Sequence, residues 1–118
     1  QKAFTQYKNT MIDLYNYAKQ YNLQVTICTN VWFSKYEGFE ELYQKAADTY
    51  SIMNYVKNTN ISGIKEEIAI AEKYNKKIET IAHTSSDSAE TESYHNDGID
   101  KLLKDQKNIL DNSKANYL

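Results

Sequence analysis

Helical and extended patterns alternate along the chain, and the alternation begins and ends with a helix. Apolar residues spaced by three and four predict a first helix from about residue 4 to 21. Its stripe consists of Phe4, Tyr7, Met11, Leu14, Ala18 and Tyr21. Residues 23–32 then alternate apolar and polar side chains with a period of two, which predicts a strand with one apolar and one mostly polar face.

Two further helix and strand patterns follow. The second helix carries Phe39, Leu42, Tyr43, Ala46 and Ala47 on one side, and a mostly apolar run over residues 50–56 predicts a buried strand. Ser62 is expected to cap a third helix, with Glu66 and Glu67 favourably placed in its first turns. Residues 76–84 predict a third strand, whose two faces are Ile78, Thr80 and Ala82, and Glu79, Ile81 and His83.

A polar, acidic stretch without periodicity runs from residue 85 to 97. It is longer than most connections between a strand and a helix, and such long loops are commonly functional or disordered. A last helix follows, with Asn96 or Asp97 as its cap and a stripe of Ile99, Leu102, Leu103 and Leu110. No strand pattern follows it, so the expected order is α-β-α-β-α-β-α.

This order predicts an α/β fold with a parallel sheet, which is either an open doubly wound sheet or a closed barrel. Polar faces on the first and third strands favour the barrel, because inward positions near the strand ends of a (β/α)8 barrel can be polar. Three strands cannot close a barrel, which needs about eight. We therefore expect residues 1–118 to form a single α/β unit that is a partial, half TIM barrel from a larger domain. The alternative is a small three-layer α/β sandwich.

Composition narrows the classes of partner. The 118 residues carry a formal net charge of −2, with lysines and acidic residues interspersed, so we expect neither a nucleic-acid nor a membrane partner. No apolar run approaches the roughly 18 residues of a membrane-spanning helix. The single cysteine, Cys28, excludes an internal disulfide, and its place in the middle of a strand predicts a buried, inert thiol.

A family resemblance enters at residues 50–55, Tyr-Ser-Ile-Met-Asn-Tyr. This run resembles the hydrophobic-Met-x-Tyr strand found late in chitinase-like and related glycosidase barrels, and the strand at 76–84 with its long loop also resembles a late barrel strand. The resemblance spans about residues 23 to 112 and implies that Tyr55 projects into a sugar site. Val56 stands where chitinases have an aspartate, and their Asp-x-x-Asp-x-Asp-x-Glu strand is absent from this sequence.

The expected carboxyl ends of the strands bring aromatic and amide side chains toward one edge. These candidate substrate-binding residues are Asn30, Trp32, Asn54 and Tyr55, with His83 beside them. Aromatic faces stack on sugar rings while amides bind hydroxyl groups, so the set suits a carbohydrate. The alternative is that Trp32 and Tyr55 are core or rim aromatics, since the chain has 11 tyrosines.

Glu79 and His83 are the candidate catalytic residues. They lie four residues apart on one strand face, roughly 13 Å, so each would act separately as a general acid or base. Glycoside hydrolysis would need a second carboxylate, for which Asp87, Glu90 and Glu92 are the nearby candidates. The alternative for Glu79 is an exposed or lysine-paired residue.

The long loop also raises a metal hypothesis, because imidazoles and carboxylates are ligands for zinc or manganese. Its members would be His83, Asp87, Glu90, Glu92, His95 and Asp97. Their spacing matches no tight motif, so we prefer a solvated acidic loop and expect no metal and no cofactor. The resulting hypothesis is a carbohydrate-active barrel unit. The alternatives are a non-catalytic module that completes its sheet by homo-oligomerisation or with a missing half, and a metal-dependent hydrolase.

Overall fold

The computed structural model describes residues 1–57, 61–113 and 116–117 and confirms the predicted alternation of helices and parallel strands. The helices and strands are α1 (Lys2–Lys19), β1 (Thr26–Asn30), α2 (Phe39–Lys45), β2 (Thr49–Met53), α3 (Lys65–Lys73), β3 (Lys77–Ile81), α4 (Gly98–Asp111) and β4 (Asn116–Tyr117). Two short 3-10 helices, η1 (Phe33–Lys35) and η3 (Ser62–Ile64), precede α2 and α3. The α/β fold class predicted from the sequence is therefore correct.

The strands form one parallel sheet in the order β1-β2-β3-β4, so strands adjacent in the sequence are also adjacent in space. The prediction that no strand follows the last helix is wrong, because Asn116 and Tyr117 pair with Lys77 and Ile78. Two residues are too few to show a period of two, and only pairing with β3 defines this strand.

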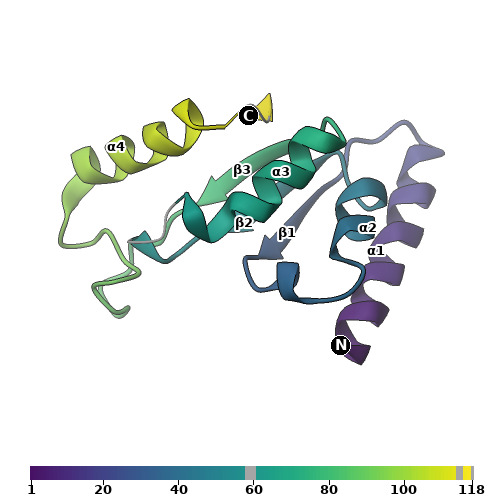
Figure 1. The fold of residues 1–118 in the computed structure, drawn as a ribbon, viewed down its shortest axis with the longest axis horizontal. Coiled ribbons are helices and arrows are strands. Elements are labelled where there is room, and N and C mark those ends of the chain that lie inside the picture. The colour runs from purple at the N-terminus through teal and green to yellow at the C-terminus, as the bar shows by residue number, and fades with distance from the viewer. Residues whose placement is uncertain (58–60, 114–115, 118) are drawn as a thin grey trace.

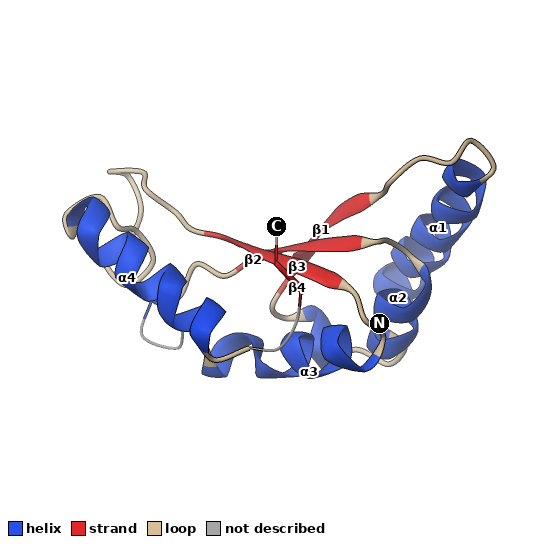
Figure 2. Cartoon of the chain, turned by 90° about the horizontal axis from the view of Figure 1, so that it is seen from above, coloured by secondary structure: helices blue, strands red, loops and turns tan. Residues whose placement is uncertain are grey.

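The helices lie on one side of this sheet, as the view along it shows (Figure 2). Right-handed crossovers that always step to the next strand in the same direction place every connecting helix on the same face. Figure 1 shows α1 beside α2 at one end of the molecule and α4 at the other. The opposite face, which we call the open face, has no described helix over it.

The core lies between the helices and the covered face of the sheet. The strands contribute Ile27, Tyr50, Ile52 and Ile78, and the helices contribute Phe4, Phe39, Leu42, Tyr43, Ile64, Ile68, Ala71 and Ile109. Tyr43 stacks on Tyr50 with 4.0 Å between ring centroids. The Tyr50 hydroxyl donates to the carbonyls of Leu42 and Tyr43, at 2.8 and 2.9 Å, and so satisfies carbonyl groups near the end of α2.

Cys28 lies on the open face and is exposed, so the prediction of a buried thiol is wrong. Its neighbours Ile27 and Thr29 point to the helices and are buried. Because side chains alternate along a strand, Cys28 must point the other way. Cys28 is exposed because β1 is an edge strand, whereas Ser51, level with it on the inner strand β2, is 4% exposed.

Two of the predicted helix details differ in the structure. Ser62 does not cap α3. It begins η3, and Ile64 occupies the N-cap position without a side-chain capping bond. Asp97 is the N-cap residue of α4, but its carboxylate pairs with Lys57 and makes no capping bond.

The predicted apolar stripe of α4 is not its buried face. Ile99, Leu103 and Leu110 remain 62%, 58% and 48% exposed, whereas Ile109 is 1% exposed. Thr80 of β3 donates a hydrogen bond to Gln106, which also faces the sheet. The helix α4 lies at the end of the molecule formed by β3 and β4. Because β4 has only two residues, the sheet there offers little surface that could bury the stripe.

Candidate functional site

The candidate site lies where the parallel strands end. Asn30, Met53 and Ile81 are in register across β1, β2 and β3. Tyr55 and His83 each follow their aligned residue by two positions, just beyond the ends of β2 and β3. Their ring centroids are 5.3 Å apart at an interplanar angle of 36°. The structure therefore brings together two of the residues that the sequence analysis selected.

Asn30 and Trp32 mark the end of β1. The Asn30 side-chain oxygen accepts a hydrogen bond of 2.9 Å from the backbone N–H of Trp32, which starts the turn into η1. The Trp32 indole is 64% exposed, and the ammonium group of Lys35 lies 5.1 Å from its ring centroid. Trp32 is thus an aromatic residue of the rim rather than of the core.

Asn54 is buried, with 7% of its surface exposed, between Met53 and Tyr55. Its amide is therefore not presented at the molecular surface of this structure. Of the four predicted substrate-binding residues, Trp32 is exposed, Asn30 and Tyr55 are partly exposed, and Asn54 is enclosed.

His83 connects the strand end to the long loop. Its Nε2 atom is hydrogen-bonded to the hydroxyl of Ser88, and its carbonyl accepts a bond of 2.8 Å from the N–H of Tyr94. Ser93 closes the loop by donating to the carbonyl of Ser85 at 2.7 Å. The loop is therefore folded back against the end of β3.

Lys57 attaches this loop to the end of β2. Its ammonium group donates to the carbonyl of Ser93 at 2.7 Å, pairs with the Asp97 carboxylate and lies 5.3 Å from the centroid of Tyr94. Tyr94 in turn donates to Asp105 of α4 at 2.9 Å. One cation thus connects β2, the loop and the start of α4.

The loop does not assemble a metal site in the described part of the chain, which includes all of residues 85–97. No three His, Cys, Asp or Glu side chains there are grouped so that they could hold an ion. Asp97 is engaged by Lys57, and Glu90 accepts a bond from Asn96 at 3.4 Å. The six residues of the alternative metal hypothesis are therefore not brought together in this part of the chain.

Glu79 lies in the middle of β3 on the open face, level with Ser51 and Cys28. The Ser51 hydroxyl donates a hydrogen bond to its carboxylate. Among the described residues Glu79 has no lysine within ion-pair distance, so its partner is a hydroxyl group. A cavity of about 350 Å³ lies between Glu79 and Thr80 on one side and α4 on the other.

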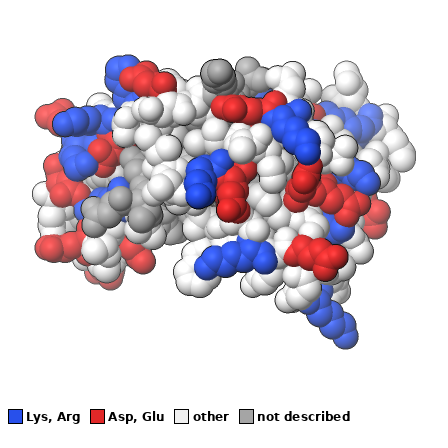
Figure 3. Space-filling model, in the orientation of Figure 1, with Lys and Arg blue, Asp and Glu red and all other residues white. Residues whose placement is uncertain are grey.

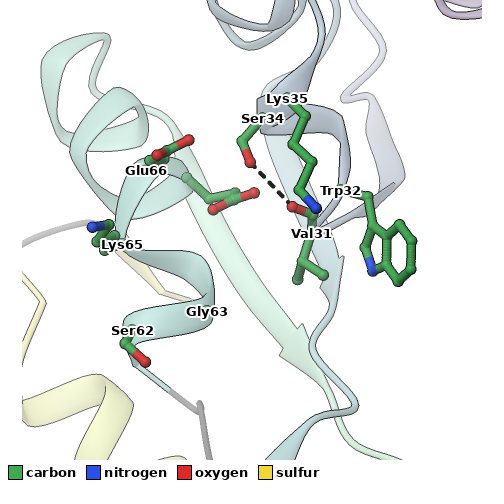
Figure 4. Close-up of a pocket in the computed structure, with 9 residues that line it drawn as sticks. Val31, Trp32, Ser34, Lys35, Ser62, Gly63, Lys65 and Glu66 are labelled. Atoms are coloured by element: carbon green, nitrogen blue, oxygen red, sulfur yellow. Dashed lines mark hydrogen bonds between the residues drawn. The ribbon is translucent and has the colours of Figure 1, made fainter.

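A second cavity, of about 220 Å³, lies at the same edge between the β1–α2 connection and the start of α3 (Figure 4). Its lining residues are Val31, Trp32, Ser34, Lys35, Ser62, Gly63, Lys65, Glu66 and Glu67. Figure 4 shows Ser34 and Lys35 on the strand side and Ser62 and Lys65 on the helix side.

Glu67 is the residue of this cavity that the sequence analysis missed. It is 1% exposed, and its Oε1 atom has no hydrogen-bond partner among the described residues. Burial raises its pKa to about 7; a bond from its own backbone N–H opposes the shift and Glu66 adds to it. A signal was present, since Glu67 follows Ile64 by three and precedes Ala71 by four on the apolar stripe.

Lysine and acidic side chains are interspersed over the face shown in Figure 3. None of the described helices is both long enough and apolar enough to cross a membrane. No family model, curated protein or solved structure matches this chain.

Proposed function

We propose that this chain contributes part of a sugar-binding site at the carboxyl edge of its parallel sheet, as a unit of a glycoside-hydrolase-like barrel. The observation that carries the proposal is the pair of rings of Tyr55 and His83, 5.3 Å apart just beyond the ends of β2 and β3. Trp32 adds an exposed aromatic surface at the end of β1. Aromatic surfaces with adjacent polar groups are suited to the two chemical faces of a sugar.

The composition of the open face supports a barrel unit. Its central row is Cys28, Ser51 and Glu79, and two further polar residues, Thr26 and Asn30, lie on β1. The inward face of a barrel can carry such residues toward the strand ends. A sheet with helices on one face and consecutive strand order is what such a unit requires.

The candidate catalytic residues have different environments. His83 lies at the strand end beside Tyr55 and Ser88, where a proton can be exchanged with a bound ligand. Glu79 lies deeper and is hydrogen-bonded by Ser51. Hydrolysis would require a second carboxylate about 5 to 10 Å from the first, so binding is the part of the proposal that this chain can be tested for.

The test is an oligosaccharide titration followed by NMR, with a mixed set of β-linked and α-linked trisaccharides. We expect Tyr55→Ala to weaken binding at least tenfold, as expected for the loss of an aromatic contact. Tyr21→Ala is the matched control, because Tyr21 is an exposed tyrosine just past the end of α1. Binding that is equal in the two variants would contradict the proposal.

The open face also supports a second candidate, a non-catalytic module that pairs with a second copy of itself. Among the described residues no further strand pairs with the outer edges of β1 and β4, so a strand of another chain could add there. In a pair of copies the open faces would also shield each other. Light scattering coupled to size exclusion tests this directly. A dimer in which the Cys28 thiol is unreactive supports it, and a monomer with a reactive thiol excludes it.

A further inference from the structure

The cavity beside α3 contains a buried carboxyl group with a free oxygen. Buried polar groups in proteins are almost always hydrogen-bonded, and one left without a partner costs about 1–3 kcal/mol. Glu67 is 1% exposed and its Oε1 atom is unpartnered among the described residues. The nearby Tyr43 hydroxyl is already hydrogen-bonded to Thr29 at 3.1 Å. Glu67 lines the cavity, so a molecule bound there lies beside this carboxyl group.

The size of the cavity limits what can enter. Its volume of about 220 Å³ is below the roughly 300–1,000 Å³ of pockets that hold drug-sized ligands. The cavity is therefore suited to a molecule of about one ring. It opens at the carboxyl edge beside Trp32, so a ligand can reach it from the same edge as the proposed sugar site.

The charges around the cavity argue against an ionic ligand. Lys35 and Lys65 line it together with Glu66 and Glu67, so the lining carries charges of both signs and favours neither a cation nor an anion. Ser34 donates its hydroxyl proton to the carbonyl of Val31 at 3.1 Å, which leaves its oxygen able to accept a bond. Hydroxyl groups of an uncharged ligand can bond to both this oxygen and the Glu67 carboxyl.

We propose that this cavity binds a small, uncharged, polyhydroxylated molecule and that Glu67 forms a hydrogen bond to one of its hydroxyl groups. The ligand class rests on the proposed carbohydrate function, whereas the cavity and its free carboxyl oxygen do not. Glu67 belongs to the first turn of α3 and not to the aromatic pair, so this is a subsite separate from Tyr55 and His83.

The experiment is an NMR titration of the whole chain with glucose, and with glucosamine at pH 6 as a positively charged probe of the same ring. We expect glucose to shift the Gly63 amide and the Glu67 carboxyl carbon in a saturable way. Glu67→Leu should weaken this binding about tenfold, the loss of one buried hydrogen bond. Glu67→Gln should retain it, because an amide both donates and accepts, and Glu72→Gln is the control at an exposed residue of the same helix that does not line the cavity.

Three outcomes would overturn the proposal. They are the absence of saturable shifts with glucose, equal binding by Glu67→Leu and the unchanged chain, and binding of glucosamine in preference to glucose. Thermal melts of each variant establish that it is folded, and the glucose and glucosamine titrations of the unchanged chain still test the proposal if Glu67→Leu is not. Tyr55→Ala should leave the glucose shifts at Gly63 unchanged. The glucose titration therefore tests the cavity independently of the trisaccharide titration that tests the site at Tyr55 and His83.

Discussion

The ring of Tyr55 lies 5.3 Å from the ring of His83, at the carboxyl ends of two neighbouring parallel strands. The two residues occupy equivalent positions, each two past a residue pair in register, Met53 and Ile81. This relationship defines the edge at which the exposed Trp32 and the Glu67 cavity also lie. It depends on strand pairing and not on proximity in the sequence.

The aromatic contact predicts a spectroscopic signature. Removing the ring in Tyr55→Ala should shift the His83 ring protons, because they lie within the ring-current field of Tyr55. Tyr55→Phe keeps the ring and should leave those shifts nearly unchanged. NMR of the His83 ring protons gives the measurement, with His95 as an internal reference on the exposed part of the loop. Identical His83 shifts in all three proteins would contradict the contact.

Asp48 predicts a loss of stability in acid. Burial opposes ionisation of its carboxylate, but bonds from Lys19 at 2.7 Å, the N–H of Val25 at 2.8 Å and the Tyr15 hydroxyl at 3.0 Å hold its pKa below the usual value. Because the pKa of Asp48 is lower in the folded state than its usual value of 3.8, the ionised carboxylate stabilises the fold at pH values above about 3.8. This stabilisation is lost as the pH falls through the pKa of the folded state.

Asp48→Asn should therefore lower the free energy of unfolding at pH 7 by about 1–2 kcal/mol, with the difference shrinking below about pH 3. Urea unfolding at several pH values measures it. Asp13→Asn is a control at an exposed acidic residue of α1. If Asp48→Asn lowers the free energy of unfolding by the same amount at every pH, then lost packing, rather than lost charge, is responsible.

The carboxyl group of Glu67 should make the free energy of unfolding depend on pH in the opposite sense to Asp48. Its pKa is raised by burial to about 7 from an ordinary 4.5, so the folded state keeps the proton while the unfolded state loses it. This carboxyl group therefore destabilises the fold progressively as the pH rises from about 4.5 to 7. Glu67→Gln removes the titration and should be more stable than the unchanged chain by on the order of 3 kcal/mol at pH 8.

At pH 4 the two proteins should have nearly the same free energy of unfolding, because Glu67 is then protonated in both states. Glu66→Gln, at an exposed neighbour, should show much less dependence on pH. Equal stability of Glu67→Gln and the unchanged chain at pH 8 would show that the buried carboxylate is compensated in solution.

We expect the contacts of the Lys57 side chain to stabilise the loop at residues 85–97. Lys57→Ala removes the bond to the Ser93 carbonyl and the pair with Asp97. Since the side chain of Lys57 is only 12% exposed, we expect the loop to open more easily by about 1–2 kcal/mol. Hydrogen exchange of the Tyr94 and Gly98 amides, which bond to the carbonyls of His83 and Tyr94, would be roughly tenfold faster.

The matched control is Lys101→Ala. Lys101 forms an ion pair with Asp105 within α4, but its side chain is 51% exposed, and such pairs contribute little. It should leave exchange in the loop almost unchanged. If Lys57→Ala has as small an effect as this control, then the loop is held by its own backbone bonds.

The reactivity of the Cys28 thiol reports whether the open face is covered. Its exposed thiol should react with a maleimide in the folded protein as readily as in the unfolded chain. Strong protection that disappears on dilution would show that a second copy covers the face.

The elements of the fold were predictable because their signals are local. The stripe of the first helix and the period of two around Ile27 arise from side-chain geometry along a single element. The same logic failed for Ser62, because a 3-10 turn precedes α3, and for β4, because its two residues are defined by the pairing of Lys77 with Asn116.

The site was predictable in part. The residues at the strand ends were identified because parallel strands end at one edge, and the ring contact of Tyr55 and His83 agrees with that expectation. Asn54 was expected at the surface and is buried, and the residues of the alternative metal hypothesis are not brought together among the described residues. Glu67 was overlooked, since a glutamate in a first helical turn has an ordinary explanation in the helix dipole.

The sequence by itself determined the order of helices and strands from α1 to α4, the parallel α/β class and the alternation of faces along β1. Only the tertiary structure decided which faces are covered. It exposes Cys28 and the leucine stripe of α4, and it encloses Glu67. The physical reason is that periodicity is set within one element, whereas burial depends on which other elements pack against it, and that follows from strand order and the hand of the crossovers.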